Sequence, residues 1–296
     1  MASKDKSPKV QANKRAKGDN GSKTVPWKAE DKNSACPYLV IPSAKAMIEF
    51  LEKIFDDIKT VLLVENEERV RHAEVKINND SILMMGDSMP GWDPCKAHVH
   101  VYVPDVDKTY EKALKAGAKG LQEPIKHQDP NRRCAILDPS GYITFWISTQ
   151  IEPREPAKED TVVPWKPDSQ VSVASYLVVQ KSTEMTAFLE KVFDAKEVFK
   201  FEMKDVVVHA EVEINKDSIV MMCDVQPGWI TEPVPCHVHV YVPDVDATFQ
   251  KALEAGGKEV QKPEKKDDAD KRGGFKDPSD TVTFWVATQV EVPAST

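Results

Sequence analysis

Two histidines and a tyrosine share one face of a predicted strand, and this strand occurs twice in the chain. The sequence HVHVYVPDVD starts at residue 98 and again at residue 237, without a single change. Strict alternation of polar and apolar residues predicts a β-strand whose polar side chains all point to one face. Because imidazole and phenol groups are costly to bury without partners, they are predicted to be solvated, hydrogen-bonded or part of a binding site. These residues are His98, His100 and Tyr102 in the first copy and His237, His239 and Tyr241 in the second.

A second polar stripe, also repeated, joins a histidine to a glutamate two residues later. His72 precedes Glu74 in the first copy, and His209 precedes Glu211 in the second. Both members of each pair lie on one face of a predicted strand. If both stripes of one copy line one cavity, that cavity contains three imidazoles and a carboxylate. Such a set could bind a metal ion, provide the glutamate as a general base, or bind an anion. It could equally be a hydrogen-bonded or solvent-facing surface of the sheet.

Two tryptophans and two cysteines are further candidates. Trp92 and Trp229 each follow Pro-Gly in a predicted loop, where an indole could cover a planar ligand or pack against the rim of its own domain. Cys36 and Cys236 could be metal ligands or reactive thiols, although small buried residues are the simpler interpretation.

The chain is a duplication. The motif Tyr-Leu-Val starts at residues 38 and 176, and TFW followed by Thr-Gln closes both copies. The offset between copies is 137 residues from His72 to His209 and 139 residues from His98 to His237. Two domains are therefore predicted, over residues 34–150 and 172–291. The segment 151–171 is predicted to be a linker, and residues 1–33 a disordered, lysine-rich tail.

Composition limits the classes of partner. The net charge is −8 and 30% of the residues are charged, which favours a protein that binds neither nucleic acid nor membrane. The five cysteines include no CxxC pair, and no signal peptide is recognisable. A cytoplasmic protein with free thiols is therefore predicted.

Within each copy the residue pattern predicts a strand, a helix and three strands, and then the same order again. In the first copy an apolar strand over 38–41 precedes a helix that has Ser43 as its N-cap. The HVHVYV strand opens the second half, and a helix that starts near Asp105 or Asp107 follows it. Each copy is thus predicted to consist of two βαβββ modules.

In this order the motifs resemble the vicinal oxygen chelate superfamily, which contains glyoxalases, bleomycin-resistance proteins and extradiol dioxygenases. The resemblance is nearest to the PhnB-like branch and rests on YLVI, IEFLEKIF, HAEVKINNDSILMMGD, HVHVYVPDVDKTYEKALKAGA and LDPSGY. It implies an α+β fold of two tandem glyoxalase-like domains, each with two βαβββ modules that form a cupped eight-stranded mixed sheet. It also implies a pseudo-dimer within one chain, which could be a monomer in solution.

The resemblance also implies where a metal would be bound. Active members hold a divalent ion such as zinc, nickel or iron with side chains from four strands of one cup. Carried over to this sequence, the fifth-strand ligand falls on His98 and His237. The metal site is thus expected to be degenerate, with these two histidines as its remaining ligands. The other three positions are altered or lost: Cys36 or Ala174 on the first strand, Ile82–Met85 or Ile219–Met222 on the fourth, and Phe145 or Phe284 on the last.

The function that the resemblance favours is a small-molecule-binding protein, comparable to the drug-sequestering members of the superfamily. One alternative is a divalent-metal-dependent lyase, isomerase or dioxygenase, and another is a non-catalytic scaffold. Glu74 and Glu211 are the candidate catalytic residues, and His98 and His237 the candidate metal ligands. The candidate ligand-binding residues are His72, His100, Tyr102, His209, His239, Tyr241, Trp92 and Trp229.

Overall fold

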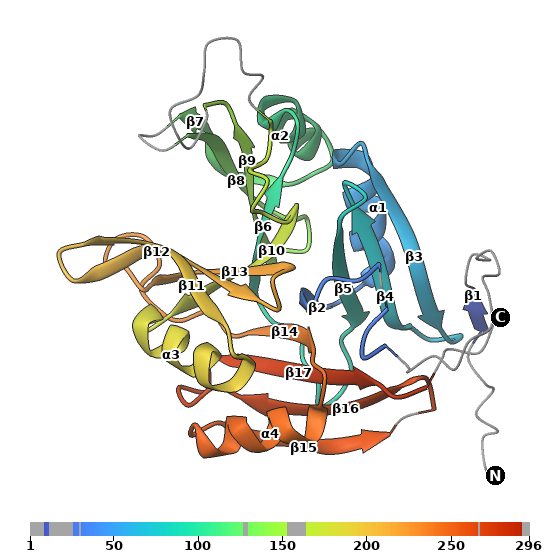
Figure 1. Ribbon diagram of the computed structural model, residues 1–296. Coiled ribbons are helices and arrows are strands. Elements are labelled where there is room, and N and C mark those ends of the chain that lie inside the picture. Colours follow the sequence, from blue (N-terminus) through green and yellow to red (C-terminus); the bar gives the residue numbers. More distant parts are fainter. Residues whose placement is uncertain are drawn as a thin grey trace.

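The computed structural model describes residues 9–11, 26–29, 31–126, 130–152, 164–265 and 267–291. Both repeats form the predicted order of strand, helix and three strands, twice over (Figure 1). A short strand, β1 (Lys9–Gln11), precedes them. The first repeat contains β2 (Ala35–Ile41), α1 (Ala44–Ile54), β3 (Ile58–Glu65), β4 (Val70–Ile77), β5 (Ser81–Asp87), β6 (Ala97–Tyr102), α2 (Val106–Lys115), β7 (Lys119–Lys126), β8 (Asn131–Leu137) and β9 (Ile143–Gln150). The second contains β10 (Val173–Val179), α3 (Ser182–Phe193), β11 (Lys196–Met203), β12 (Val206–Ile214), β13 (Ser218–Asp224), β14 (Cys236–Tyr241), α4 (Val245–Glu254), β15 (Lys258–Lys265), β16 (Asp270–Lys276) and β17 (Val282–Gln289).

Two large mixed sheets organise these elements, and each sheet combines halves of both repeats. Sheet 1 has the strand order β1-β3-β4-β5-β2-β14-β17-β16-β15, and sheet 2 has the order β11-β12-β13-β10-β6-β9-β8-β7. The first module of one repeat therefore continues into the second module of the other. The α+β fold with eight repeat strands in each sheet is confirmed. The expectation that each repeat forms its own eight-stranded sheet is not met, because each sheet takes four strands from each repeat.

The seam of each sheet is an antiparallel strand pair between the two repeats. β2 pairs with β14, which places Tyr38 opposite His237. β10 pairs with β6, which places Tyr176 opposite His98. Because HVHVYV is identical in both repeats, its sequence cannot specify which first module it joins. The choice of partner therefore depends on contacts outside this strand.

Side-chain hydrogen bonds at two turns also join the repeats. The carboxylate of Asp217, in the turn between β12 and β13, accepts hydrogen bonds from the backbone N–H and the hydroxyl of Ser34, at 3.1 and 3.0 Å. In the equivalent turn of the first repeat, Asp80 accepts from the backbone N–H of Ser172 at 3.2 Å. Each turn thus binds the residue that precedes the first strand of the other repeat, β2 or β10.

The four helices cover one face of the sheets and form the main core with it. Ser43 caps α1 by accepting a hydrogen bond from the N–H of Ala46, and Asp105 and Asp244 cap α2 and α4 in the same way. Alternate strand residues complete this core, which leaves the other residues of each strand for the opposite face. The apolar face of α1 contributes Met47, Phe50, Leu51 and Ile54.

Parts of the predicted tail and linker are ordered. The prediction of a disordered tail over residues 1–33 is wrong for its last residues, because the carbonyl of Trp27 accepts a hydrogen bond from the N–H of Gln289 at 2.8 Å. In the predicted linker, the carbonyl of Trp165 accepts from the N–H of Gln150 at 2.8 Å in the same way. The remaining parts of these two predictions, residues 1–8, 12–25, 30 and 153–163, lie outside the described residues.

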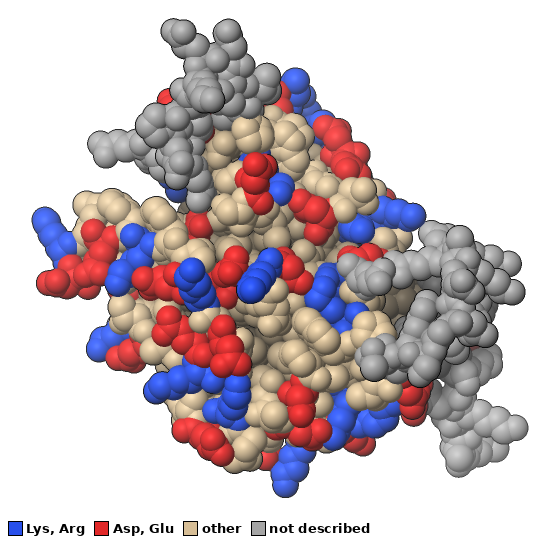
Figure 2. Space-filling model, in the orientation of Figure 1, with Lys and Arg blue, Asp and Glu red and all other residues tan. Residues whose placement is uncertain are grey.

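Acidic and basic side chains are interspersed over the described surface that Figure 2 shows. This mixing accompanies the moderate net charge of −8. None of the described helices is long and apolar enough to cross a membrane.

Candidate functional site

The predicted polar residues lie on the face of each sheet that the helices leave uncovered. We call this face cup 1 in sheet 1 and cup 2 in sheet 2. On the strands at the seam of sheet 1, Tyr38 and Tyr241 belong to a small cluster in cup 1, whereas the neighbouring Leu39 and Val240 belong to the main core. Cup 2 has an equivalent cluster that includes Tyr102.

The two polar stripes meet across the repeats and not within them. The condition that both stripes of one copy line one cavity is not met for His72, Glu74 and His98, because β4 lies in sheet 1 and β6 in sheet 2. Each cup still has three imidazoles and a carboxylate on its strands, as the residue types predict, but they come from both repeats. Cup 1 contains His72, Glu74, His237, His239 and Tyr241, and cup 2 contains His209, Glu211, His98, His100 and Tyr102.

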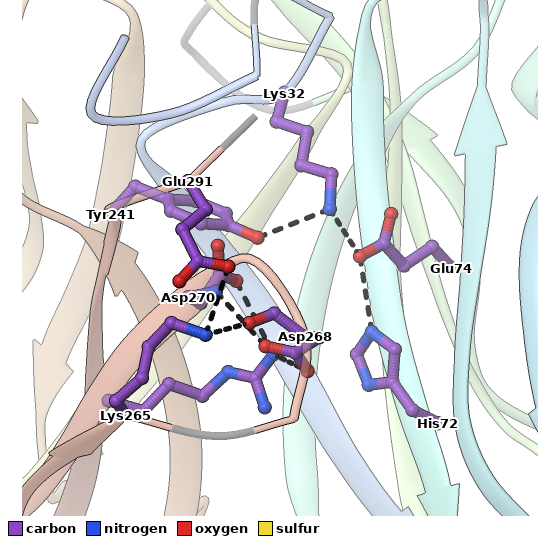
Figure 3. A network of polar contacts seen from close by, with 9 residues as sticks. Lys32, His72, Glu74, Tyr241, Lys265, Asp268, Asp270 and Glu291 are labelled. Carbon is purple, nitrogen blue, oxygen red and sulfur yellow. Dashed lines mark hydrogen bonds and ion pairs between the residues drawn. The ribbon is translucent and has the colours of Figure 1, made fainter. Parts of the chain in front are cut away.

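A buried ion pair organises cup 1. Figure 3 shows the amino group of Lys32 between Tyr241 and Glu74. Lys32 Nζ lies 2.6 Å from Glu74 Oε1 and 3.1 Å from the Tyr241 hydroxyl. The same Glu74 oxygen is 3.1 Å from His72 Nε2. Lys32 precedes β2, Glu74 and His72 lie on β4, and Tyr241 ends β14, so this network also connects the two repeats.

The ion pair keeps Glu74 ionised. Burial by itself would raise the pKa of this carboxyl, but the hydrogen bond from His72 and the charge of Lys32 outweigh burial and lower the pKa to about 2. Burial likewise acts to lower the pKa of Lys32, and Glu74 outweighs it, so that this pKa lies above its usual value. Both groups are therefore charged at any physiological pH.

In cup 2 a histidine and a neutral amide contact the equivalent carboxylate, Glu211. Gln170 takes the place of Lys32, and its amide nitrogen donates a hydrogen bond to Glu211. His209 Nε2 lies 3.3 Å from Glu211, close to the equivalent distance in cup 1. A lysine–glutamate pair in cup 1 thus corresponds to a glutamine–glutamate pair in cup 2.

The two histidines at the superfamily's metal position are bonded to tryptophans. Trp285 Nε1 donates to His237 Nδ1 at 3.0 Å, and Trp146 Nε1 donates to His98 Nδ1 at 3.2 Å. Since Nδ1 accepts a hydrogen bond, a neutral ring must carry its proton on Nε2. Burial, with a smaller effect from the nearby Lys276, lowers the pKa of His237 to about 4, and burial beside Lys96 does the same for His98. Both rings are therefore neutral at pH 7.

We expect this to be measurable in an NMR pH titration. The Cε1 protons of His98 and His237 should shift with a midpoint near pH 4, whereas an unperturbed histidine titrates near pH 6.5. The variants His98→Gln and His237→Gln assign the two signals. A midpoint of 6 or above for both would mean that the rings are solvated and not held against the tryptophans.

The residues at the superfamily's metal positions do not fit a divalent ion. In its neutral form, His237 accepts a hydrogen bond from Trp285 at Nδ1 and carries its proton on Nε2. Neither nitrogen therefore has a free lone pair for a metal ion. Burial raises the pKa of Cys36 and keeps it a thiol, and Met84 faces cup 1 from β5. Phe284 lies in the main core, on the face opposite to His237, so that Trp285 takes the last-strand position in cup 1. Among the described residues, no three His, Cys, Asp or Glu side chains are grouped so that they could hold a metal ion. The equivalent residues of cup 2 are Ala174, Met221, Phe145 and Trp146.

Cys36 and Cys236 are both buried thiols, as the simpler interpretation of the sequence predicts. Cys236 belongs to the main core, so it lies on the opposite face of β14 from His237. Burial raises its pKa well above the usual range of a thiol. Neither cysteine therefore has the environment of a nucleophile.

Aromatic rings line both cups. In cup 1, the ring centroid of Trp92 lies 5.9 Å from that of Tyr38 and 5.9 Å from that of Trp285. In cup 2, Trp229 and Trp146 are 5.4 Å apart and nearly perpendicular, and Trp229 is 47% exposed. Each loop tryptophan thus packs across the repeats, onto a residue of the other copy, and not only on the rim of its own domain.

Four residues of cup 1 were not among the candidate site residues predicted from the sequence. Lys32 lay in the lysine-rich segment that was predicted to be disordered, and nothing in its neighbourhood distinguished it. Tyr38 and Trp285 belong to motifs that marked the duplication, and their alternation with apolar residues could have placed them on the cup face. Arg272 of β16 forms ion pairs with Asp268 and Asp270, in a loop and strand whose charges suggested only a solvated segment.

Comparison with known proteins identifies the family. A model of the Glyoxalase/Bleomycin resistance protein/Dioxygenase superfamily matches residues 37–144 and 170–286. The chain belongs to this superfamily, and both repeats are members of it.

The individual relatives have low sequence identity to this chain. An uncharacterised protein of Mycobacterium bovis is 32% identical over 119 residues, which cover 36% of this chain and 76% of the relative. Another M. bovis protein, named "Putative glyoxylase CFP32", is 24% identical over 205 residues, which cover 65% of this chain and 70% of that protein. Among solved structures, glyoxalase I from Zea mays has a TM-score of 0.60 at 18% identity, over 86% of this chain and 92% of the maize chain. At this identity the structural likeness shows the shared fold alone.

Proposed function

We propose that the cups bind flat, unsaturated small molecules through aromatic contacts and hydrogen bonds, without a metal ion. The observation that carries this proposal is that the superfamily's last-strand metal position is a tryptophan in each cup, Trp285 or Trp146, which is hydrogen-bonded to the remaining histidine. In cup 1, Trp285 stands where a last-strand ligand would have to lie, and its indole N–H is bonded to the remaining histidine at 3.0 Å. A site of this kind offers indole and phenol surfaces on which a planar ligand can stack.

The polar groups support binding more than proton transfer. A general base works best when its pKa lies near the working pH, and the pKa of Glu74 is about 2. The charge of this carboxylate is already engaged by Lys32 and its lone pairs by Lys32 and His72. Glu74 therefore fits the role of an anchor for the wall of cup 1, in place of the catalytic role that its sequence position suggested.

The test is binding of 4-methylumbelliferone, a flat fluorescent phenol, to protein from which metals have been removed with a chelator. We expect saturable quenching of the tryptophan fluorescence. Trp92→Ala removes one wall of cup 1 and should weaken the tighter binding step by about 10-fold, the equivalent of ~1.4 kcal/mol. Leu114→Ala truncates an exposed apolar side chain of α2, on the helix-covered side of the sheets and outside both cups, and should leave binding unchanged.

Two results would contradict the proposal. The first is the absence of binding to wild-type protein whose thermal unfolding transition shows that it is folded. The second is equal weakening by Trp92→Ala and Leu114→Ala, which would place the bound dye outside the cups.

A further inference from the structure

Three large apolar side chains are exposed on β11, the outer strand of sheet 2. Phe199, Phe201 and Met203 are 45%, 48% and 54% exposed. β11 stands at the end of the strand order of this sheet, so that among the described strands only β12 pairs with it. In Figure 1 the hairpin of β11 and β12 projects from the rest of the molecule. An apolar edge strand in such a position is a template for pairing with another strand.

The equivalent edge of sheet 1 pairs with a further strand. Val64 of β3 is the counterpart of Phe201, because each lies opposite the histidine of its repeat, His72 or His209. β1 runs antiparallel to β3 and places Val10 opposite Val64. The duplication therefore shows that this edge of the fold accepts a ninth strand, and that the described residues supply one to sheet 1 alone.

The opposite edges of both sheets are less suited to such pairing. The outer strands β7 and β15 each contain a proline, Pro124 or Pro263. Proline has no backbone N–H, and on an outer strand it hinders the addition of another strand. β11 contains no proline, so it is the described sheet edge that is most open to a partner.

The sequence of β11 is complementary to itself. In an antiparallel pair centred on Phe201, this residue lies opposite the same residue of a second copy, and Phe199 lies opposite Met203. On the other face Lys200 lies opposite Glu202, and the two-fold axis repeats this pair. A pair centred on Lys200 or on Glu202 instead places two like charges opposite each other, which is destabilising. Charge complementarity therefore favours a second copy as the partner, in one register.

We propose that this chain forms a two-fold symmetric dimer in which β11 pairs antiparallel with β11 of a second copy, centred on Phe201. The dimer joins two eight-stranded sheets into one, with both cups 2 on the same side of it. The contact is confined to residues 199–203 of each chain, which places it at the small end of specific interfaces. We therefore expect a dissociation constant on the order of 10 μM.

Sedimentation velocity of the full chain, from about 1 to about 200 μM, measures this association. Phe201→Lys places two ammonium groups at the two-fold axis and should raise the dissociation constant by at least about 10-fold. Leu121→Lys makes the matched change on β7, the opposite edge strand of the same sheet, where Leu121 is 49% exposed. This control should leave the dissociation constant unchanged.

Exchange of the two charges tests the register. Lys200→Glu places two carboxylates opposite each other, Glu202→Lys places two ammonium groups there, and each should weaken the dimer by about 5-fold. The double variant Lys200→Glu/Glu202→Lys restores opposite charges and should return the dissociation constant to within about 2-fold of wild type. Both side chains are exposed, at 37% and 42%, so these variants carry the test if Phe201→Lys fails to fold.

Four results would overturn the inference. The first is a chain that stays monomeric over the whole concentration range. The second is equal weakening by Phe201→Lys and Leu121→Lys, and the third is a double charge variant that is as weak as the single variants. The fourth is amide hydrogen exchange of residues 199–203 that does not slow as the concentration rises, because the edge is then open or covered by another segment of the same chain.

Discussion

Replacement of Glu74 by glutamine is expected to lower the free energy of unfolding by about 3 kcal/mol at pH 7, because it leaves the Lys32 ammonium buried without its counter-charge. The side chain of Glu74 is 4% exposed and that of Lys32 is 19% exposed, so solvent cannot replace the lost partner. Urea denaturation of the full chain, followed by circular dichroism, measures the change. The loss of one partner is costly even where the intact pair adds little, since the pair has already lost its hydration.

The pH dependence of stability provides a second estimate of the same interaction. The pKa of Glu74 is about 2 in the folded protein, against an ordinary value of 4.5. A depressed carboxyl pKa stabilises the folded state above the unfolded-state pKa, and this contribution is lost as the pH falls through the folded-state pKa. The window is therefore pH 4.5 to 2, and the shift corresponds to about 3 kcal/mol. Lys32 adds nothing in this window, because it is protonated in both states.

The duplication supplies the matched controls. Lys32→Gln recreates the glutamine–glutamate contact that Gln170 and Glu211 form in cup 2, and it should cost less than Glu74→Gln, because an amide still donates a hydrogen bond to the buried carboxylate. The double variant Lys32→Gln/Glu74→Gln removes both charges and should recover most of the stability lost in Glu74→Gln. Equal losses in Glu74→Gln and in the double variant would show that the ion pair is not what stabilises this wall of the cup.

Cleavage of the chain between the repeats is expected to yield two halves that cannot fold as monomers. When residues 1–157 and 158–296 are produced separately, β2 and β6 of the first half lose the strands with which they pair across the seam, as do β10 and β14 of the second. Each half contains one module of each sheet. We therefore expect the separate halves to form homodimers that imitate the whole chain, or to aggregate through the unpaired edges.

Co-expression of the halves is expected to rescue the fold. Because the seams join whole modules, the halves should form a 1:1 complex with a dissociation constant below about 1 μM. Native mass spectrometry gives the stoichiometry, and the intact chain is the control for mass and elution volume. Two folded monomeric halves, each with its own histidine stripes in one cup, would contradict the exchange of modules.

The order of helices and strands can be predicted from the local sequence pattern. Which residues share a cup cannot be predicted in this way. Apolar alternation and the duplicated motifs predict the order of elements in each repeat. The identity of the HVHVYV strand in both copies, however, leaves its partner undetermined, and this partner decides whether His72 meets His98 or His237. Contacts distant in sequence, such as that of Asp217 with Ser34, specify the exchange.

The site shows the same limit at the level of single residues. The position carried over for the last-strand ligand was Phe284, but that side chain lies in the main core and Trp285 lies in the cup. A shift of one residue along a strand moves a side chain to the opposite face, so a register taken from distant relatives is unreliable here. Lys32 was missed for a different reason: a lone lysine in a polar segment has no pattern that shows it to be buried.

The central claim is that the cups bind their ligand without a metal ion. The most direct measurement combines elemental analysis of the purified protein with titration of 4-methylumbelliferone before and after treatment with a chelator. We predict less than about 0.1 equivalent of zinc, nickel or iron per chain in the purified protein, and the same affinity for 4-methylumbelliferone before and after chelator treatment. Stoichiometric metal that is lost together with binding in His98→Ala and His237→Ala would contradict the account and would restore the metal-dependent enzyme.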